Sequence, residues 1–177
     1  MINHWLVAAH IAVLGYWFGT DLVINATYRR ACFSDHLPFA ERDRLMDHTM
    51  DIDQHVRYAL ILQTVLGSLL ATQYAFFPGG SLTMGIVIAI GVCWLTLVEV
   101  EHRTRKQPIG KLLSRIDRWW RYTLVVLLVS TAVSLVGGAW PVPDWLRWKL
   151  ALFAGVISSG LIIRFVLMRH FSVWEEM

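Results

Sequence analysis

The first hydrophobic stretch of the chain, residues 2–30, carries polar side chains of types that do chemistry inside membranes. A helix needs about 20 residues to cross a bilayer, and this run is longer. It nevertheless contains His10 and Asp21, and a turn of about 100° per residue places both near one helix face with Trp17 and Tyr28. Such groups cost a few kcal/mol at the bilayer centre. The sequence therefore predicts a polar stripe that faces other helices rather than lipid.

His10 is the first candidate ligand, about two turns inside the start of this run. A histidine in a membrane helix is the usual sign of a cofactor ligand or a proton carrier. Neutral imidazole ligates haem iron, and a four-helix bundle can enclose a porphyrin. We therefore assign His10 to haem iron and Trp17, on the same face, to the same cofactor site. A helix–helix hydrogen bond or a position at the interface remains the alternative for His10.

Two further residues are candidates for catalytic roles. Lys149 lies about one turn into the last hydrophobic run, at a depth similar to that of His10. It would meet a haem propionate or ligate a metal after losing its proton, unless its ammonium simply reaches the membrane surface. Asp21 lies deeper in the first run, where it would relay protons or form an ion pair with Arg57 or Arg164.

A second pair of histidines, His55 and His102, is expected at the opposite end of the helices. The sequence places His55 at the start of the second run and His102 just after the third. They would form a bis-histidine haem site or, with nearby carboxylates, a metal site. The carboxylates in question are Asp51, Asp53, Glu99 and Glu101. No metal-binding spacing such as HxxxH occurs there, so a charged rim is the expected role of this group.

The composition indicates an integral membrane protein. Of 177 residues, 56% are hydrophobic and 16% charged, whereas soluble domains are about a quarter charged. Most of the nine tryptophans stand at the ends of apolar runs, as in the aromatic belts of membrane proteins. The fold predicted is all-α, a single domain over 1–177 with an antiparallel bundle of about five transmembrane helices. The apolar segments are approximately 5–27, 56–77, 83–100, 122–140 and 147–169.

The basic residues predict the orientation of this bundle. All but Arg147 and Lys149 fall at the end where the first span finishes. By the positive-inside rule that end is cytoplasmic, which places the N-terminus outside and the C-terminus in the cytoplasm. The simplest setting is multi-pass insertion in a bacterial inner membrane. Membrane lipid explains the basic character, so no nucleic-acid partner is expected.

The two long connections, 28–55 and 101–121, are polar and charged. The first is expected to hold a short amphipathic helix starting near Pro38, or else to be a solvated loop. The second combines leucine and tryptophan with basic residues and is expected to lie on anionic headgroups. Within the first span, Gly15 and Gly19 form a GxxxG pattern, which allows a close helix approach or room for a flat macrocycle.

Three short segments resemble a known family. Residues 8–19, AAHIAVLGYWFG, resemble the first helix of HemJ-type protoporphyrinogen oxidases, in which a histidine precedes a Trp-Phe-Gly-like turn. ERDRLMDHTM at 41–50 is similar to that family's ERF-x-x-ME-type stretch, and WLRWKLALF at 145–153 resembles its tryptophan-to-lysine segment. A broader resemblance includes copper-resistance D-like membrane proteins. The HemJ resemblance implies b-type haem, with His10 and Lys149 functionally required.

The function expected from these patterns is that of a haem-binding membrane redox protein. The HemJ resemblance implies oxidation of protoporphyrinogen IX with electrons passed to quinone, so porphyrin and quinone are the expected small-molecule partners. Two alternatives stay open: a copper-resistance D-like protein of metal transport, or an accessory helical subunit of a larger membrane complex. Assembly as a homo-oligomer is compatible with either.

Overall fold

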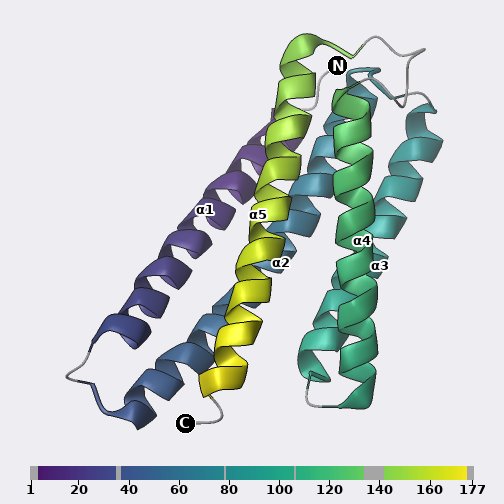
Figure 1. The fold of residues 1–177 in the computed structure, drawn as a ribbon. Helices are drawn as coiled ribbons and strands as arrows, with labels where there is room; N and C mark the ends of the chain where they lie inside the picture. The colour runs from purple at the N-terminus through teal and green to yellow at the C-terminus, as the bar shows by residue number, and fades with distance from the viewer. Residues whose placement is uncertain (1–3, 35–36, 78, 106, 134–141, 175–177) are drawn as a thin grey trace. The chain divides into compact units, whose positions relative to one another are not determined.

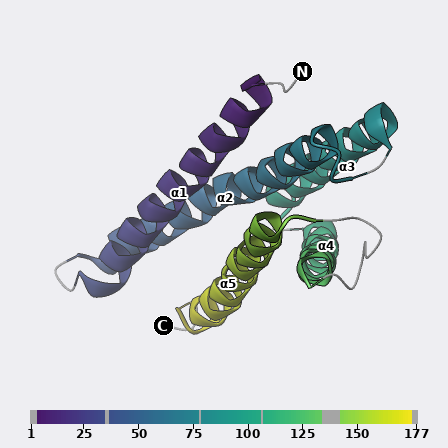
Figure 2. The ribbon, with the colours of Figure 1, turned by 90° about the horizontal axis from the view of Figure 1, so that it is seen from above.

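The protein consists of five helices in the residues described by the computed structural model, namely 4–34, 37–77, 79–105, 107–133 and 142–174. The helices are α1 (His4–Phe33), α2 (Phe39–Gln73), α3 (Gly80–Arg103), α4 (Pro108–Ala132) and α5 (Asp144–Trp174) (Figure 1). The chain divides into two compact units, Met1–Leu113 and Ser114–Met177, and each is described by itself. In the first unit α1 and α3 each pack against α2 (Figure 2).

Three helices in the described residues are long and apolar enough to cross a membrane: α1, α3 and the Asp144–Ile163 part of α5. This agrees with the predicted class, a helical membrane protein. The predicted span at 56–77 coincides with α2 as far as Gln73, and the one at 122–140 with α4 as far as Ala132, while residues 134–140 lie outside the described residues. The first halves of both helices are strongly charged. A total of five spans therefore stays a prediction, as does the orientation.

The prediction of a long polar connection over 28–55 is wrong. A helix does begin where expected, because the carbonyl of Pro38 accepts hydrogen bonds from the backbone N–H groups of Glu41 and Arg42 at 3.0 and 3.1 Å. However, α1 continues to Phe33, and α2 then runs without a break to Gln73. Neither proline nor glycine occurs between residues 39 and 66, so nothing in the sequence stops the helix. The charged segment is the first half of a single long helix.

The connection predicted over 101–121 is likewise mostly helical. Helix α3 ends at Arg103, and α4 starts at Pro108, a residue that suits the first helical position because no intrahelical partner is needed for its nitrogen. Within α4, Arg121 forms an ion pair with Asp117 one turn earlier, at 2.9 Å. This segment was predicted to be a polar connection on anionic headgroups, whereas its residues from Pro108 onward belong to a helix that continues to Ala132.

The antiparallel register of α1 and α2 is defined by three contacts along their length. His10 meets Gln63, Tyr16 meets His55, and the Arg42 guanidinium donates from its Nε to the carbonyl of Ala31 at 2.7 Å. The apolar second half of α2 thus lies beside the start of α1. Its charged first half lies beside the end of α1, where Arg42 supplies a partner for a terminal carbonyl.

Helix α3 approaches the other side of α2 closely at a glycine. A Cβ atom built on Gly91 would lie 2.5 Å from Cγ2 of Val65, so any side chain at this position would collide. The buried apolar residues of this contact include Ile61, Trp94 and Val98. Close packing here places the charged ends of α2 and α3 side by side.

Candidate functional site

His10 lies in the contact between α1 and α2, with 9% of its surface exposed. Its Nε2 is 3.1 Å from the side-chain nitrogen of Gln63, one turn before Gly67 on α2. An amide nitrogen only donates, so Nε2 of His10 accepts and carries the lone pair. Gly67 provides the space for the ring, since a Cβ there would lie 3.3 Å from Cε1 of His10. His10 is therefore packed between the helices through an amide hydrogen bond.

His55 occupies a different kind of environment. Its Nδ1 is 2.7 Å from the Tyr16 hydroxyl on α1, and the two rings meet edge to face at an angle of 87°. The Tyr58 ring contacts it from one turn further along α2, with centroids 6.1 Å apart. The residue is exposed, and its Nε2 has no hydrogen bond within the described part of the chain. One nitrogen of His55 is thus held, and the other belongs to an exposed residue.

This position corrects the sequence interpretation of His55. The sequence placed it at the start of a helix near the cytoplasmic end, but α2 begins at Phe39, so His55 lies in the middle of the helix. Its partner Tyr16 is likewise near the middle of α1. The expected bis-histidine partner, His102, is half-buried in the last turn of α3.

A polar contact continues from the His55 site to α3. The Tyr58 hydroxyl donates a hydrogen bond to the Glu99 carboxylate. Arg103, one turn further along α3, pairs with the same carboxylate. Tyr58 therefore contacts the His55 ring by its edge and an anionic group by its hydroxyl. The row Tyr16, His55, Tyr58 and Glu99 connects α1, α2 and α3.

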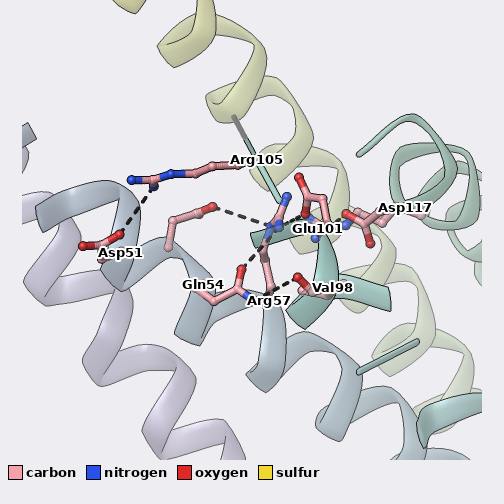
Figure 3. A network of polar contacts seen from close by, with 9 residues as sticks. Asp51, Gln54, Arg57, Val98, Glu101, Arg105 and Asp117 are labelled. Atoms are coloured by element: carbon pink, nitrogen blue, oxygen red, sulfur yellow. Dashed lines mark hydrogen bonds and ion pairs between the residues drawn. The ribbon is translucent and has the colours of Figure 1, made fainter. Parts of the chain in front are cut away.

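Beside this row lies a buried charged cluster between α2 and α3 (Figure 3). Arg57 pairs with Glu101 and also donates to the side-chain oxygen of Gln54 at 3.3 Å. The Gln54 amide in turn donates to the carbonyl of Val98 at 3.2 Å. Asp53 adds a longer contact to Arg57, at 3.9 Å. The group joins the two helices through the Arg57–Glu101 ion pair and the hydrogen bond from Gln54 to the α3 backbone.

The carboxylates that suggested a metal site are largely matched with arginines. Asp51 pairs with Arg105 at 3.4 Å, and Glu99 and Glu101 have the arginine partners given above. Within the ranges that the structure describes, no three His, Cys, Asp or Glu side chains come together as metal ligands. The Asp51–Arg105 pair is exposed, whereas the Arg57–Glu101 pair is buried between α2 and α3, so a charged rim stays a prediction for this group.

The remaining predicted site residues fall in separate places. Trp17 is buried on α1, whereas Lys149 is exposed on α5 and belongs to the second unit. Asp21 lies on α1, where its side chain is exposed. Arg57 forms ion pairs with Glu101 and Asp53, and the side chain of Arg164 lies outside the described residues.

Sequence reasoning missed the partners of both histidines. Gln63 is a lone amide inside an otherwise apolar run, and Gly67 follows it by one helical turn. That spacing is a usable signal for a polar contact beside a small residue on one face. Tyr16 gave no such signal, because a tyrosine in a membrane helix usually marks the interface. Gly15 and Gly19 are not at a close helix contact, since a Cβ at either meets no atom within 4 Å.

The haem that the resemblance implies can be compared with these two imidazoles. His10 does not suit an iron ligand in this packing, because the Nε2 lone pair is directed at Gln63 between two helices in contact. His55 suits it, because ligating histidines are usually held by a hydrogen bond at the other nitrogen. The donor chemistry for haem is therefore present in the first unit, on α2.

No protein-family model, no curated protein and no solved structure matches this chain.

Proposed function

We propose that this chain is a haem-binding redox protein of the membrane, with haem b as its cofactor. One observation carries the proposal: each of the two packed helices α1 and α2 holds a histidine fixed by a hydrogen bond from the other helix. His10 is held by Gln63, and His55 by Tyr16. Imidazoles fixed within membrane helices serve as ligands or proton carriers, and a hydrogen bond at the second nitrogen orients a ligating ring.

The reaction implied by the resemblance is oxidation of protoporphyrinogen IX, with quinone as the electron acceptor, in a bacterial inner membrane. Haem, when bound, supplies the one-electron chemistry of such a reaction. The protein would bind and orient the rings and handle protons. Asp21 is the proposed proton-handling group because it is an ionisable side chain in a helix apolar enough to cross a membrane. Lys149, a cation on α5, is proposed to meet carboxylates of the porphyrin.

The visible spectrum of the purified protein tests haem binding. The detergent-solubilised protein from haem-replete cells is expected to show a Soret band and, after dithionite reduction, a sharp α band. Replacing both His10 and His55 by alanine should abolish the bands, whereas His48→Ala, an exposed histidine on the same helix as His55, should leave them unchanged. A colourless protein that also fails to bind added hemin would overturn the proposal. Bound copper without a Soret band would instead support the metal-transport alternative.

The role of Lys149 has a separate test. Lys149→Met should lower haem retention or protoporphyrinogen oxidation, because it removes the proposed cation for carboxylates. Lys111→Met, at an exposed lysine of α4, is the matched control and should change neither. If Lys149→Met also changed neither, the lysine would have only the role of a side chain that reaches the membrane surface.

A further inference from the structure

We infer that His55, rather than His10, is the imidazole that ligates the haem iron, and that Tyr16 is its positioning residue. The inference rests on the proposed function and names the residues of the site. It differs from the sequence interpretation, which gave the first place to His10. The reason lies in which ring nitrogen each histidine leaves accessible.

His10 has no accessible ligating nitrogen in this structure. Its Nε2 accepts the amide hydrogen bond of Gln63, and the ring is 9% exposed between α1 and α2. Gly67 lies against the ring on α2, so the two backbones are close at this level. Iron at Nε2 would have to displace Gln63 and separate the helices. That cost applies to His10 and is absent at His55.

His55 already has the arrangement of a held ligand. Nδ1 is 2.7 Å from the Tyr16 hydroxyl, which accepts a hydrogen bond when Nδ1 carries the proton. In that tautomer Nε2 carries the lone pair, and it belongs to an exposed residue. A hydrogen bond of this kind fixes the ring orientation and raises the basicity of the metal-binding nitrogen. Tyr16 therefore sets the direction of the ring, and its hydroxyl accepts the Nδ1 proton in the tautomer that ligates iron through Nε2.

The surroundings of His55 favour a large flat cofactor. The rings of Tyr16 and Tyr58 both meet the imidazole of His55 edge to face. These two contacts restrict rotation of the imidazole ring. Next to Tyr16, Gly15 and Gly19 leave the surface of α1 uncovered, with no atom within 4 Å of a Cβ placed at either.

Hemin titration of the detergent-solubilised full chain, followed by absorbance and by electron paramagnetic resonance, tests the assignment. His55→Ala is expected to lose the Soret and α bands of the bound haem, and added imidazole should restore them in His55→Gly. His10→Asn, which retains a polar side chain towards Gln63, should keep the bands. Tyr16→Phe should weaken hemin binding by about tenfold to a hundredfold, as loss of an outer hydrogen bond typically does. Tyr58→Phe keeps the ring contact and serves as its control.

The outcomes distinguish failure of the proposed haem binding from failure of the assignment of His55 as the ligand. If the unaltered protein binds no hemin, the proposed function fails. If it binds hemin and His55→Gly binds equally well with an unchanged spectrum, the function stands and the assignment of His55 is overturned. Loss of the bands in His10→Asn with retention in His55→Gly would return the ligand to His10. Equal affinity of Tyr16→Phe and the unaltered protein would remove Tyr16 as the positioning residue.

Discussion

Arg57 on α2 and Glu101 on α3 form an ion pair whose side chains are only 5% and 7% exposed. Gln54 completes the group by binding both Arg57 and the carbonyl of Val98 (Figure 3). A buried ion pair is not a large source of stability in itself, because both charges lose their hydration. Removal of one partner is costly, however, because it leaves the other charge buried.

Arg57→Gln should therefore destabilise the first unit by about 3–5 kcal/mol. The measurement is the unfolding of the detergent-solubilised protein by heat or denaturant. Arg105→Gln is the matched control, because Arg105 pairs with Asp51 at 42% side-chain exposure and its loss should cost less than about 1 kcal/mol. Equal effects of the two substitutions would show that the Arg57 pair is not buried in the folded protein.

Gly91→Ala should destabilise the contact of α2 with α3 by about 1–3 kcal/mol, as added volume does in a packed core. The new Cβ would lie 2.5 Å from Cγ2 of Val65. Gly85→Ala on the same helix meets no atom within 4 Å and should stabilise the helix by about 0.5–1 kcal/mol. Thermal unfolding of the pair compares them directly, and a stabilising Gly91→Ala would contradict the close approach.

Arg42→Ala should loosen the end of α1, because Arg42 donates to the carbonyl of Ala31 at 2.7 Å. The expected loss is about 1.5–3 kcal/mol, the range for a hydrogen bond that involves a charged group. Hydrogen exchange of the last turn of α1 should accelerate. Arg44→Ala is the control, because the Arg44 side chain is 81% exposed in its pair with Glu41. Hydrogen exchange of the last turn of α1 should be the same in this variant as in the unaltered protein. Unchanged exchange in Arg42→Ala would exclude the capping role.

Gln63→Leu should change the imidazole nitrogen signals of His10 in histidine-labelled protein. In the unaltered protein Nε2 accepts the amide N–H, so it should appear unprotonated and hydrogen-bonded. The leucine removes that hydrogen bond, at an expected cost of about 1 kcal/mol in unfolding free energy. Thr64→Val, the adjacent position on α2, should leave the His10 signals unchanged. A protonated Nε2 in the unaltered protein would mean that the Gln63 oxygen, rather than its nitrogen, faces His10.

Much of the architecture was predictable from hydropathy and charge. Apolar runs, terminal tryptophans and the low charge content indicated membrane helices, and Pro38 marked the start of a helix that the structure contains. The extent of the helices was not predicted, because charged residues were interpreted as loop. Charge does not stop a helix when no proline or glycine interrupts it, and α2 shows this over residues 39–66.

The residues of the candidate site could be named only in part. His10, His55 and Asp21 were selected because ionisable groups are rare in apolar runs. Their partners depended on the register between helices, which no periodicity within one helix specifies. A shift of one turn, about 5.4 Å, would pair Tyr16 with a residue other than His55. Gln63 and Tyr16 thus acquired their roles from contacts between positions 53 and 39 residues apart in the chain.

The sequence by itself determined that the chain forms apolar helices and which ionisable groups those helices carry. These properties follow from the composition and spacing of each segment alone. The tertiary structure decided which imidazole is buried and which is accessible. His10 packs where Gly67 lets α1 approach α2, whereas His55 is anchored at Nδ1 by Tyr16 and remains exposed. The physical reason is that each interhelical hydrogen bond occupies one imidazole nitrogen, and the packing of the two helices determines which nitrogen that is.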